Sequence, residues 1–109
     1  MNASSVTEIS AGEFLQRRER GDVMTLLDVR EDWELSIASV PDVVHIPMAA
    51  VPSRLNELDR NNEVVVLCRS GRRSLEIAKL LQLNGFRALN LSGGILAWSR
   101  DVDPTIPTY

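Results

Sequence analysis

The chain has 109 residues, 44% hydrophobic and 25% charged, which predicts one globular domain spanning residues 1–109 and excludes a disordered chain. One cysteine and one histidine cannot form an intramolecular disulfide or a structural zinc site, so we expect folding without a metal or other cofactor. The net charge of −3 gives no overall basic face for nucleic acid, and the longest strongly apolar run, Val64–Cys68, is too short for a membrane helix.

Strand-like and helix-like segments alternate along the chain. Ser10 and Glu13 form a capping box, which predicts a helix that Gly21 ends. Strands are predicted at 6–9, 23–29, 43–46, 63–67 and 87–91, and further helices at 31–37, 53–58, 74–84 and 95–99. Residues 1–4 and 101–109 are predicted to be flexible or extended tails. This alternation predicts an α/β sandwich with a largely parallel sheet and a ligand site beyond the carboxyl ends of central strands.

Cys68 follows the most strand-like segment and precedes a predicted helix. The residues after it contain no apolar side chain and three arginines; they are Arg69, Ser70, Gly71, Arg72 and Arg73. Main-chain N–H groups at a helix N-terminus, with guanidinium groups beside them, bind anions and stabilise a thiolate. The alternative, a cysteine that is only the last buried residue of a strand, does not account for this loop. We therefore predict that Cys68 is a nucleophile in an anion-binding loop.

The segment from Cys68 to Ser74 resembles the active-site loop of the rhodanese family of sulfurtransferases. Further family-like segments follow in the expected order: 27–31 with Trp33-Glu34, 45–47, 85–86, and 91–95 with Ala97-Trp98. The resemblance implies an α/β sandwich of three layers around a five-stranded, mostly parallel sheet. It also implies that Cys68 carries sulfur as a persulfide. The tail, Asp103-Pro104 to Tyr109, is similar to that of rhodanese domains fused to ubiquitin-like-protein activating enzymes.

Two features of the chain bear on this resemblance. Where the family usually has Gly-His-Ile-Pro-Gly-Ala, residues 38–43 read Ala-Ser-Val-Pro-Asp-Val, which questions the local turn rather than the chemistry. Related phosphatases and arsenate reductases place five residues between the cysteine and the closing arginine, whereas this chain places four between Cys68 and Arg73. The smaller loop favours attack on sulfur over binding of a tetrahedral oxyanion.

Five residues outside the loop are further candidates for a functional role. His45, the only histidine, lies in a short strand-like run and is predicted to be a partly buried structural residue. Asp28 and Arg30 are predicted to form an internal pair that fixes the loop. Trp33 and Trp98 are predicted to be core residues or pocket walls.

The loop and the family resemblance thus predict a thiosulfate sulfurtransferase. A cytoplasmic location is predicted because no apolar signal-peptide core precedes the domain. Cys68 would take sulfur from a small anionic donor, bound by residues 69–73, and pass it to a thiol or a protein acceptor. The alternative is a sulfur carrier that acts only within a protein complex, for example in delivery to a protein thiocarboxylate. A phosphatase or an arsenate reductase is a weaker alternative. No membrane partner is expected, and the oligomeric state is left open.

Overall fold

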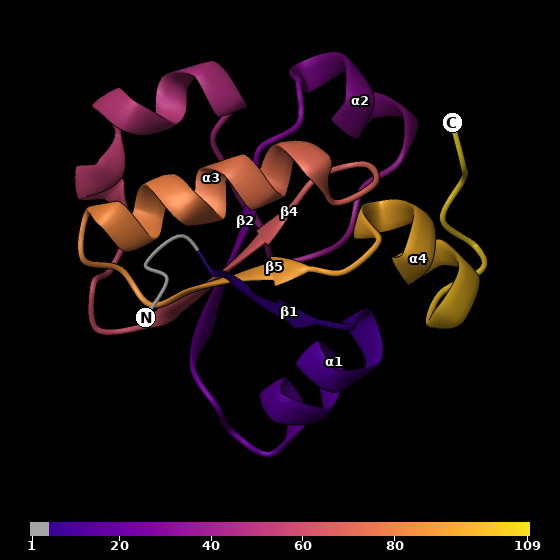
Figure 1. Cartoon of the computed structure of the whole chain (residues 1–109). Helices are drawn as coiled ribbons and strands as arrows, with labels where there is room; N and C mark the ends of the chain where they lie inside the picture. The colour runs from indigo at the N-terminus through magenta and orange to yellow at the C-terminus, as the bar shows by residue number, and fades with distance from the viewer. Residues whose placement is uncertain (1–4) are drawn as a thin grey trace.

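The computed structural model describes residues 5–109, which form a five-stranded parallel sheet with helices on both faces (Figure 1). The strands have the order β1-β5-β4-β2-β3 and comprise β1 Thr7–Ile9, β2 Met24–Asp28, β3 Val44–His45, β4 Glu63–Leu67 and β5 Ala88–Leu91. The α-helices are α1 Ala11–Glu19, α2 Asp32–Ile37, α3 Arg72–Leu83 and α4 Gly94–Asp101. The predicted α/β class and the predicted parallel sheet are confirmed. Among residues 5–109, no helix is long and apolar enough to cross a membrane.

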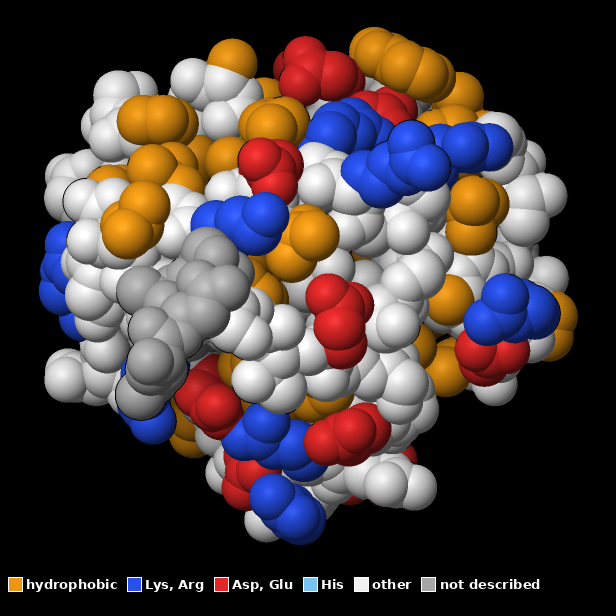
Figure 2. All heavy atoms as spheres, in the orientation of Figure 1, with side chains coloured by type: hydrophobic (Ala, Val, Ile, Leu, Met, Phe, Trp, Pro, Cys, Tyr) orange, Lys and Arg blue, Asp and Glu red, His pale blue; other side chains and the backbone are white. Residues whose placement is uncertain are grey.

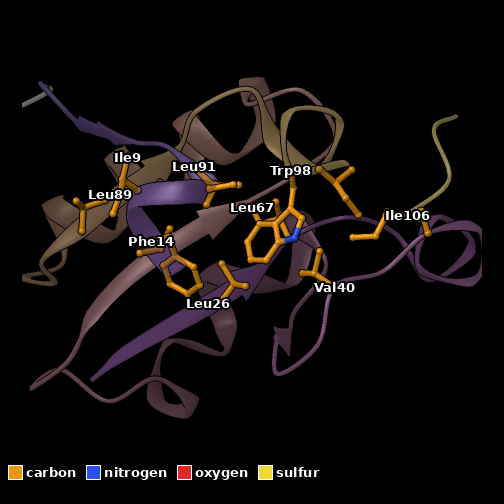
Figure 3. Close-up of a cluster of buried hydrophobic side chains, with 13 residues drawn as sticks. Ile9, Phe14, Leu26, Val40, Leu67, Leu89, Leu91, Trp98 and Ile106 are labelled. Carbon is orange, nitrogen blue, oxygen red and sulfur yellow. The ribbon is translucent and has the colours of Figure 1, made fainter. Parts of the chain in front are cut away.

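The central strand β4 separates two hydrophobic clusters. Val65 and Leu67 join the cluster packed under α1 and α4 (Figure 3). Val64 and Val66 join the cluster under α3, and the next alternate residue, Cys68, belongs to that second cluster. Burial of both faces explains why this strand is almost entirely β-branched and apolar. The same alternation directs the Cys68 side chain to the side of the sheet that α3 covers.

The segment between β3 and β4 differs from the prediction of one helix at 53–58. It forms two 3-10 helices, η1 Met48–Ser53 and η2 Leu55–Glu57. Pro52, predicted to begin a helix, lies inside η1. Its missing N–H prevents a continuous α-helical ladder, and the bonds that form join residues three apart, such as Arg54 N–H to the Val51 carbonyl at 3.0 Å. The prediction placed the first of these helices too late in the chain.

Residues 38–43, where the chain departs from the family pattern, form the turn before β3. Asp42 has φ +62°, in the left-handed region that Asp tolerates better than most residues with a side chain. Val40 is buried in the cluster with α1 and α4, and the Ala38 carbonyl accepts a hydrogen bond from Arg30. This segment is therefore scaffold, with Asp42 in the place of the family's second glycine.

The C-terminal segment packs on the domain. Asp101, predicted to begin the tail, is the last residue of α4. Ile106 is buried against the core, and its carbonyl accepts a hydrogen bond of 2.7 Å from Ser99 Oγ. Tyr109 lies beside α2, where its ring is 6.3 Å from that of Trp33. The predicted tail at 1–4 lies outside the described residues.

A fully buried ion pair stands at the end of β2. Asp28 and Arg30 have no exposed surface, and the Arg30 guanidinium binds both carboxylate oxygens of Asp28, with Nη2 to Oδ2 at 2.8 Å. Arg30 also donates to the Ala38 carbonyl and to the Tyr109 hydroxyl. The predicted internal pair is present, and it ties β2 to the turn before β3 and to the C-terminal segment. The Arg30 side chain makes no hydrogen bond to residues 69–73, the loop that the pair was predicted to fix.

Removing one member of this pair should destabilise the fold. Arg30→Met leaves the Asp28 carboxylate buried without its guanidinium, so we expect the free energy of unfolding to fall by about 3 to 5 kcal/mol. Urea denaturation measures this change. Arg100→Met is the matched control, because Arg100 pairs with Asp101 on the surface and should contribute less than about 1 kcal/mol. Equal effects of the two substitutions would contradict the prediction.

Candidate active site

The Cys68 side chain lies between the end of β4 and the start of α3. Only 1% of the residue is exposed. Its Sγ accepts a hydrogen bond of 3.1 Å from the Gly71 main-chain N–H and lies 3.2 Å from Ser74 Oγ. The thiol is therefore held by a main-chain donor and a hydroxyl on the helix side.

Helix α4 fixes the direction of the loop's peptide groups. The Cys68 carbonyl accepts from the Ile95 N–H at 2.9 Å, and the Arg69 carbonyl accepts from the Leu96 N–H at 3.2 Å. With the Arg69 carbonyl turned toward α4, the N–H of the same peptide group, which belongs to Ser70, is directed toward Sγ. A Cβ on Gly94 would lie 2.4 Å from the Arg69 carbonyl oxygen, so only glycine permits this contact. Gly94, the first residue of α4, is thus part of the loop's support.

Gly71 completes the curve of the loop. It has φ +100° and is the N-cap of α3, which begins at Arg72, two residues earlier than predicted. This left-handed conformation turns the chain from the loop into the helix at no steric cost to glycine. Arg72 and Arg73 consequently lie in the first helical turn, and Ser74, fully buried, faces Cys68 from the same turn.

The surroundings of Cys68 lower its pKa. Burial is the largest single effect and raises the pKa, but the hydrogen bonds together outweigh it. These come from the Ser74 hydroxyl and from the main-chain N–H groups of Ser74, Gly71 and Ser70. The thiolate is therefore stabilised mainly by hydroxyl and main-chain N–H donors rather than by the arginines.

The three arginines of the motif have different surroundings. Arg73 makes a bidentate ion pair with Glu34 of α2, with both N to O distances at 2.7 Å. Arg69 is exposed and donates to the main-chain oxygen of Tyr109. Arg72 is exposed, and its side chain makes no hydrogen bond or ion pair to any of residues 5–109. In Figure 2, basic side chains gather where α2 and the start of α3 lie in Figure 1, beside acidic and hydrophobic ones.

Glu34 links the arginine to the C-terminal segment. Its carboxylate accepts from Arg73, from the Tyr109 hydroxyl at 2.8 Å, and from the Glu31 main-chain N–H at 2.8 Å. The Arg73 guanidinium, as the strongest of these donors, lowers the pKa of Glu34 to about 2, although burial acts in the opposite direction. In turn Glu34 raises the pKa of Arg73. This pair stays charged throughout the neutral range.

The other predicted candidates have these positions. His45 is half-buried, and its Nε2 lies 2.6 Å from the Arg30 carbonyl oxygen, which agrees with a structural role. Trp98 is buried in the core, as predicted. Trp33 on α2 is 59% exposed, so of the two predicted roles, core residue or pocket wall, the structure excludes the core. Among the described residues, no group of three or more His, Cys, Asp and Glu is placed to hold a metal ion.

Four residues of the site are not predicted from the sequence: Glu34, Ser74, Asn90 and Tyr109. Glu34, Ser74 and Tyr109 stand in motifs that the family resemblance covers, but their contacts with the loop residues do not follow from those motifs. Asn90 lies on β5, is 2% exposed, and accepts a hydrogen bond of 2.5 Å from Ser74 Oγ. A polar residue inside a strand of apolar neighbours, in the segment Ala-Leu-Asn-Leu, is the signal that could have identified it.

The fold and the cysteine loop together define a class, a parallel α/β sandwich with a thiol held by main-chain N–H groups at a helix N-terminus. The profile of the rhodanese-like domain matches residues 10–101, and the chain belongs to this family.

Named relatives share most of the chain. It is 37% identical to the "Putative sulfurtransferase YtwF" of Bacillus subtilis over 91% of this chain and 96% of that protein. It is 41% identical to the "Putative sulfur carrier protein YrkF" of the same organism over 90% of this chain and 54% of that protein. The adenylyltransferase and sulfurtransferase MOCS3 of Arabidopsis thaliana is 34% identical over 94% of this chain and 26% of that protein. A rhodanese-like domain protein of Staphylococcus aureus, 28% identical, superposes with a TM-score of 0.82 over 95% of this chain and 99% of that one.

The lowered pKa of Cys68 can be measured directly, because the chain has no other cysteine. The rate of alkylation by iodoacetamide against pH should have its midpoint below the value of about 8.5 for a free thiol. Restricted access of the reagent to the buried thiol lowers the rate at every pH and does not by itself move the midpoint. The same chain unfolded in urea is the control and should titrate near the free-thiol value. A folded midpoint equal to or above the unfolded one would show that the loop does not stabilise the thiolate.

Proposed function

We propose that this chain is a sulfurtransferase that carries sulfur on Cys68 as a persulfide. The observation that carries the proposal is the thiol at the end of β4, whose Sγ accepts a hydrogen bond from the Gly71 N–H and lies 3.2 Å from Ser74 Oγ, and whose pKa is lowered. Family membership and the names of the relatives support it.

The proposed reaction has two displacements on sulfur. The Cys68 thiolate attacks the outer sulfur of thiosulfate, a new S–S bond forms, the original S–S bond breaks, and its electron pair leaves on sulfite. The Cys68 persulfide then reacts with an acceptor nucleophile such as a thiolate or cyanide. The acceptor bonds to the outer sulfur, and the electron pair of the broken S–S bond returns to Cys68 Sγ. Charge and electrons balance in both steps without an additional reactant.

The residues of the loop divide this work in the proposal. The N–H groups of Ser70 and Gly71 stabilise negative charge on sulfur at the thiol. The Arg72 guanidinium is exposed and makes no hydrogen bond or ion pair to a described residue, so it is suited to attract the anionic donor. Arg69 would help once the donor replaces the Tyr109 oxygen at its guanidinium. Arg73, held by Glu34, contributes a fixed positive charge near Cys68.

One alternative has specific support. The relative YrkF is named as a sulfur carrier, so this chain could hold the persulfide for one protein acceptor and turn over small molecules slowly. A phosphatase is less well supported. The guanidinium that closes the loop in such enzymes binds the oxyanion, whereas here both terminal nitrogens of Arg73 already bind Glu34.

The first experiment is intact-mass measurement after incubation with thiosulfate. We expect the wild-type chain to gain one sulfur atom and Cys68→Ser to gain none, because a serine oxygen forms no persulfide. The serine variant should retain the wild-type urea denaturation midpoint. Added cyanide should then remove the sulfur and release thiocyanate, and repeated turnover distinguishes an enzyme from a carrier. Substantial thiosulfate:cyanide activity in Cys68→Ser would overturn the assignment of the nucleophile.

The arginine assignments predict different kinetic defects. Arg72→Ala should raise KM for thiosulfate several-fold with little change in kcat, and high salt should remove the difference. Arg73→Ala should lower kcat by about tenfold or more, because it removes a charge fixed near the reacting sulfur. Glu34→Gln should also lower kcat, because it releases Arg73 from its ion pair. Arg54→Ala removes a surface ion pair with Glu57 and is the control, which should leave kcat unchanged. Wild-type kcat in Arg73→Ala would show that its charge does not act on the sulfur.

A further inference from the structure

Ser74 Oγ lies between two groups that compete for its single proton. Cys68 Sγ is 3.2 Å away and Asn90 Oδ1 is 2.5 Å away. All three residues are at most 2% exposed, so bulk water does not offer any of these groups another hydrogen-bond partner. A hydroxyl has one donor and can accept two hydrogen bonds. Ser74 can therefore donate to the sulfur or to the amide oxygen at any moment, but not fully to both.

The orientation of the Asn90 amide is fixed by its other partners. Nδ2 lies 3.0 Å from the Gly71 carbonyl oxygen and 3.0 Å and 3.2 Å from the two carboxylate oxygens of Glu8. A flipped amide would place Oδ1 against three oxygens that have no proton to donate. Oδ1 therefore faces Ser74 in every protonation state of Cys68.

We propose that Ser74 and Asn90 form a hydroxyl switch in which the Ser74 proton points to Asn90 when Cys68 is a thiol or persulfide and turns to Sγ when Cys68 is a thiolate. In the thiol state the Cys68 S–H donates to Ser74 Oγ, and the hydroxyl donates onward to Asn90 Oδ1. In the thiolate state Sγ has no proton to give and is the stronger acceptor, because hydrogen bonds to ionised groups are roughly twice as strong as neutral ones. Asn90 then loses its donor.

The role of the switch in turnover rests on the proposed sulfur transfer, because that reaction changes the charge on Sγ. When an acceptor takes the outer sulfur, the electron pair of the S–S bond returns to Sγ, and the Ser74 hydroxyl is in place to donate to the new thiolate. Asn90 opposes this step because its Oδ1 loses the hydrogen bond that it accepts from Ser74. Ser74 and Asn90 are thus positioning residues that set how readily Sγ becomes anionic, with Ser74 favouring the thiolate and Asn90 opposing it.

The charged groups around the switch are few. Arg73 of α3 faces Cys68 with a positive charge, and Glu34 of α2 acts through Arg73. Glu8 of β1 contacts only the amide nitrogen of Asn90 in this network. Consistent with the switch, the Ser74 side chain is the hydrogen-bond donor that lowers the pKa of Cys68 most. None of these charges competes for the hydroxyl proton of Ser74.

The test is the alkylation midpoint of Cys68 in four variants, each first checked for folding by urea denaturation. Ser74→Ala should raise the midpoint, because the thiolate loses its hydroxyl donor. Asn90→Leu should lower it, because the hydroxyl is released to the sulfur, and alkylation below the wild-type midpoint should quicken by about three- to tenfold. Asn90→Asp keeps an acceptor toward Ser74 and should leave the midpoint at or above that of the wild type. In Ser74→Ala, adding Asn90→Leu should have no further effect.

A second measurement uses the unaltered protein in case Asn90→Leu does not fold. The NMR shift of the Asn90 side-chain carbonyl carbon should change with pH at the Cys68 midpoint, as the amide oxygen loses its donor, and should stay constant in Ser74→Ala. A constant shift in the wild type, or a lower alkylation midpoint in both Asn90→Leu and Asn90→Asp, would overturn the switch. Neither readout needs sulfur transfer. Failure of the persulfide assay with these titrations intact would overturn the proposed function alone.

Discussion

The site depends on the capture of two loop carbonyls by the start of α4. The Cys68 and Arg69 carbonyls accept hydrogen bonds from Ile95 and Leu96, and this contact requires glycine at position 94. A peptide group has its carbonyl and N–H on opposite sides. Fixing the Arg69 carbonyl toward α4 therefore directs the Ser70 N–H, on the same peptide group, to Sγ. An element that contributes no side chain to the sulfur thus orients one of the donors that lower the pKa of the thiol.

The sequence predicts the elements whose signals are local. The strand Glu63–Leu67 is found with the predicted bounds, because a run of β-branched apolar residues suits only a buried strand. The predicted Ser10 cap is also present, with Glu13 N–H donating to Ser10 Oγ. It could be predicted because the two partners are only three residues apart in the chain. The segment at 48–57 was predicted less well, because Pro52 is compatible with either the first turn of an α-helix or the end of a 3-10 turn.

The candidate site divides in the same way. The position of Cys68 and its glycine-containing loop are contiguous in the chain, and the sequence predicts them together. The partners that distinguish the arginines are not contiguous, because Glu34 precedes Arg73 by 39 residues and Tyr109 follows Arg69 by 40. Nothing in the charge pattern of the loop indicates which arginine is paired. Three arginines that look equivalent in the sequence therefore differ in the structure. The Arg73 side chain is paired with Glu34, the Arg69 side chain binds the C-terminal segment, and the Arg72 side chain has no hydrogen bond or ion pair to residues 5–109.

The pairing of Glu34 with Arg73 also separates the acid stability of the domain from the ionisation of its thiol. Because the folded state lowers the pKa of Glu34 from 4.5 to about 2, the pair stabilises the fold fully above the unfolded value. That contribution is lost only as the pH falls toward the folded value. Above the unfolded pKa of Glu34, Arg73 therefore keeps one position and one charge. In that range, a change in sulfur chemistry with pH reflects Cys68 and its hydrogen bonds rather than a rearrangement of the loop.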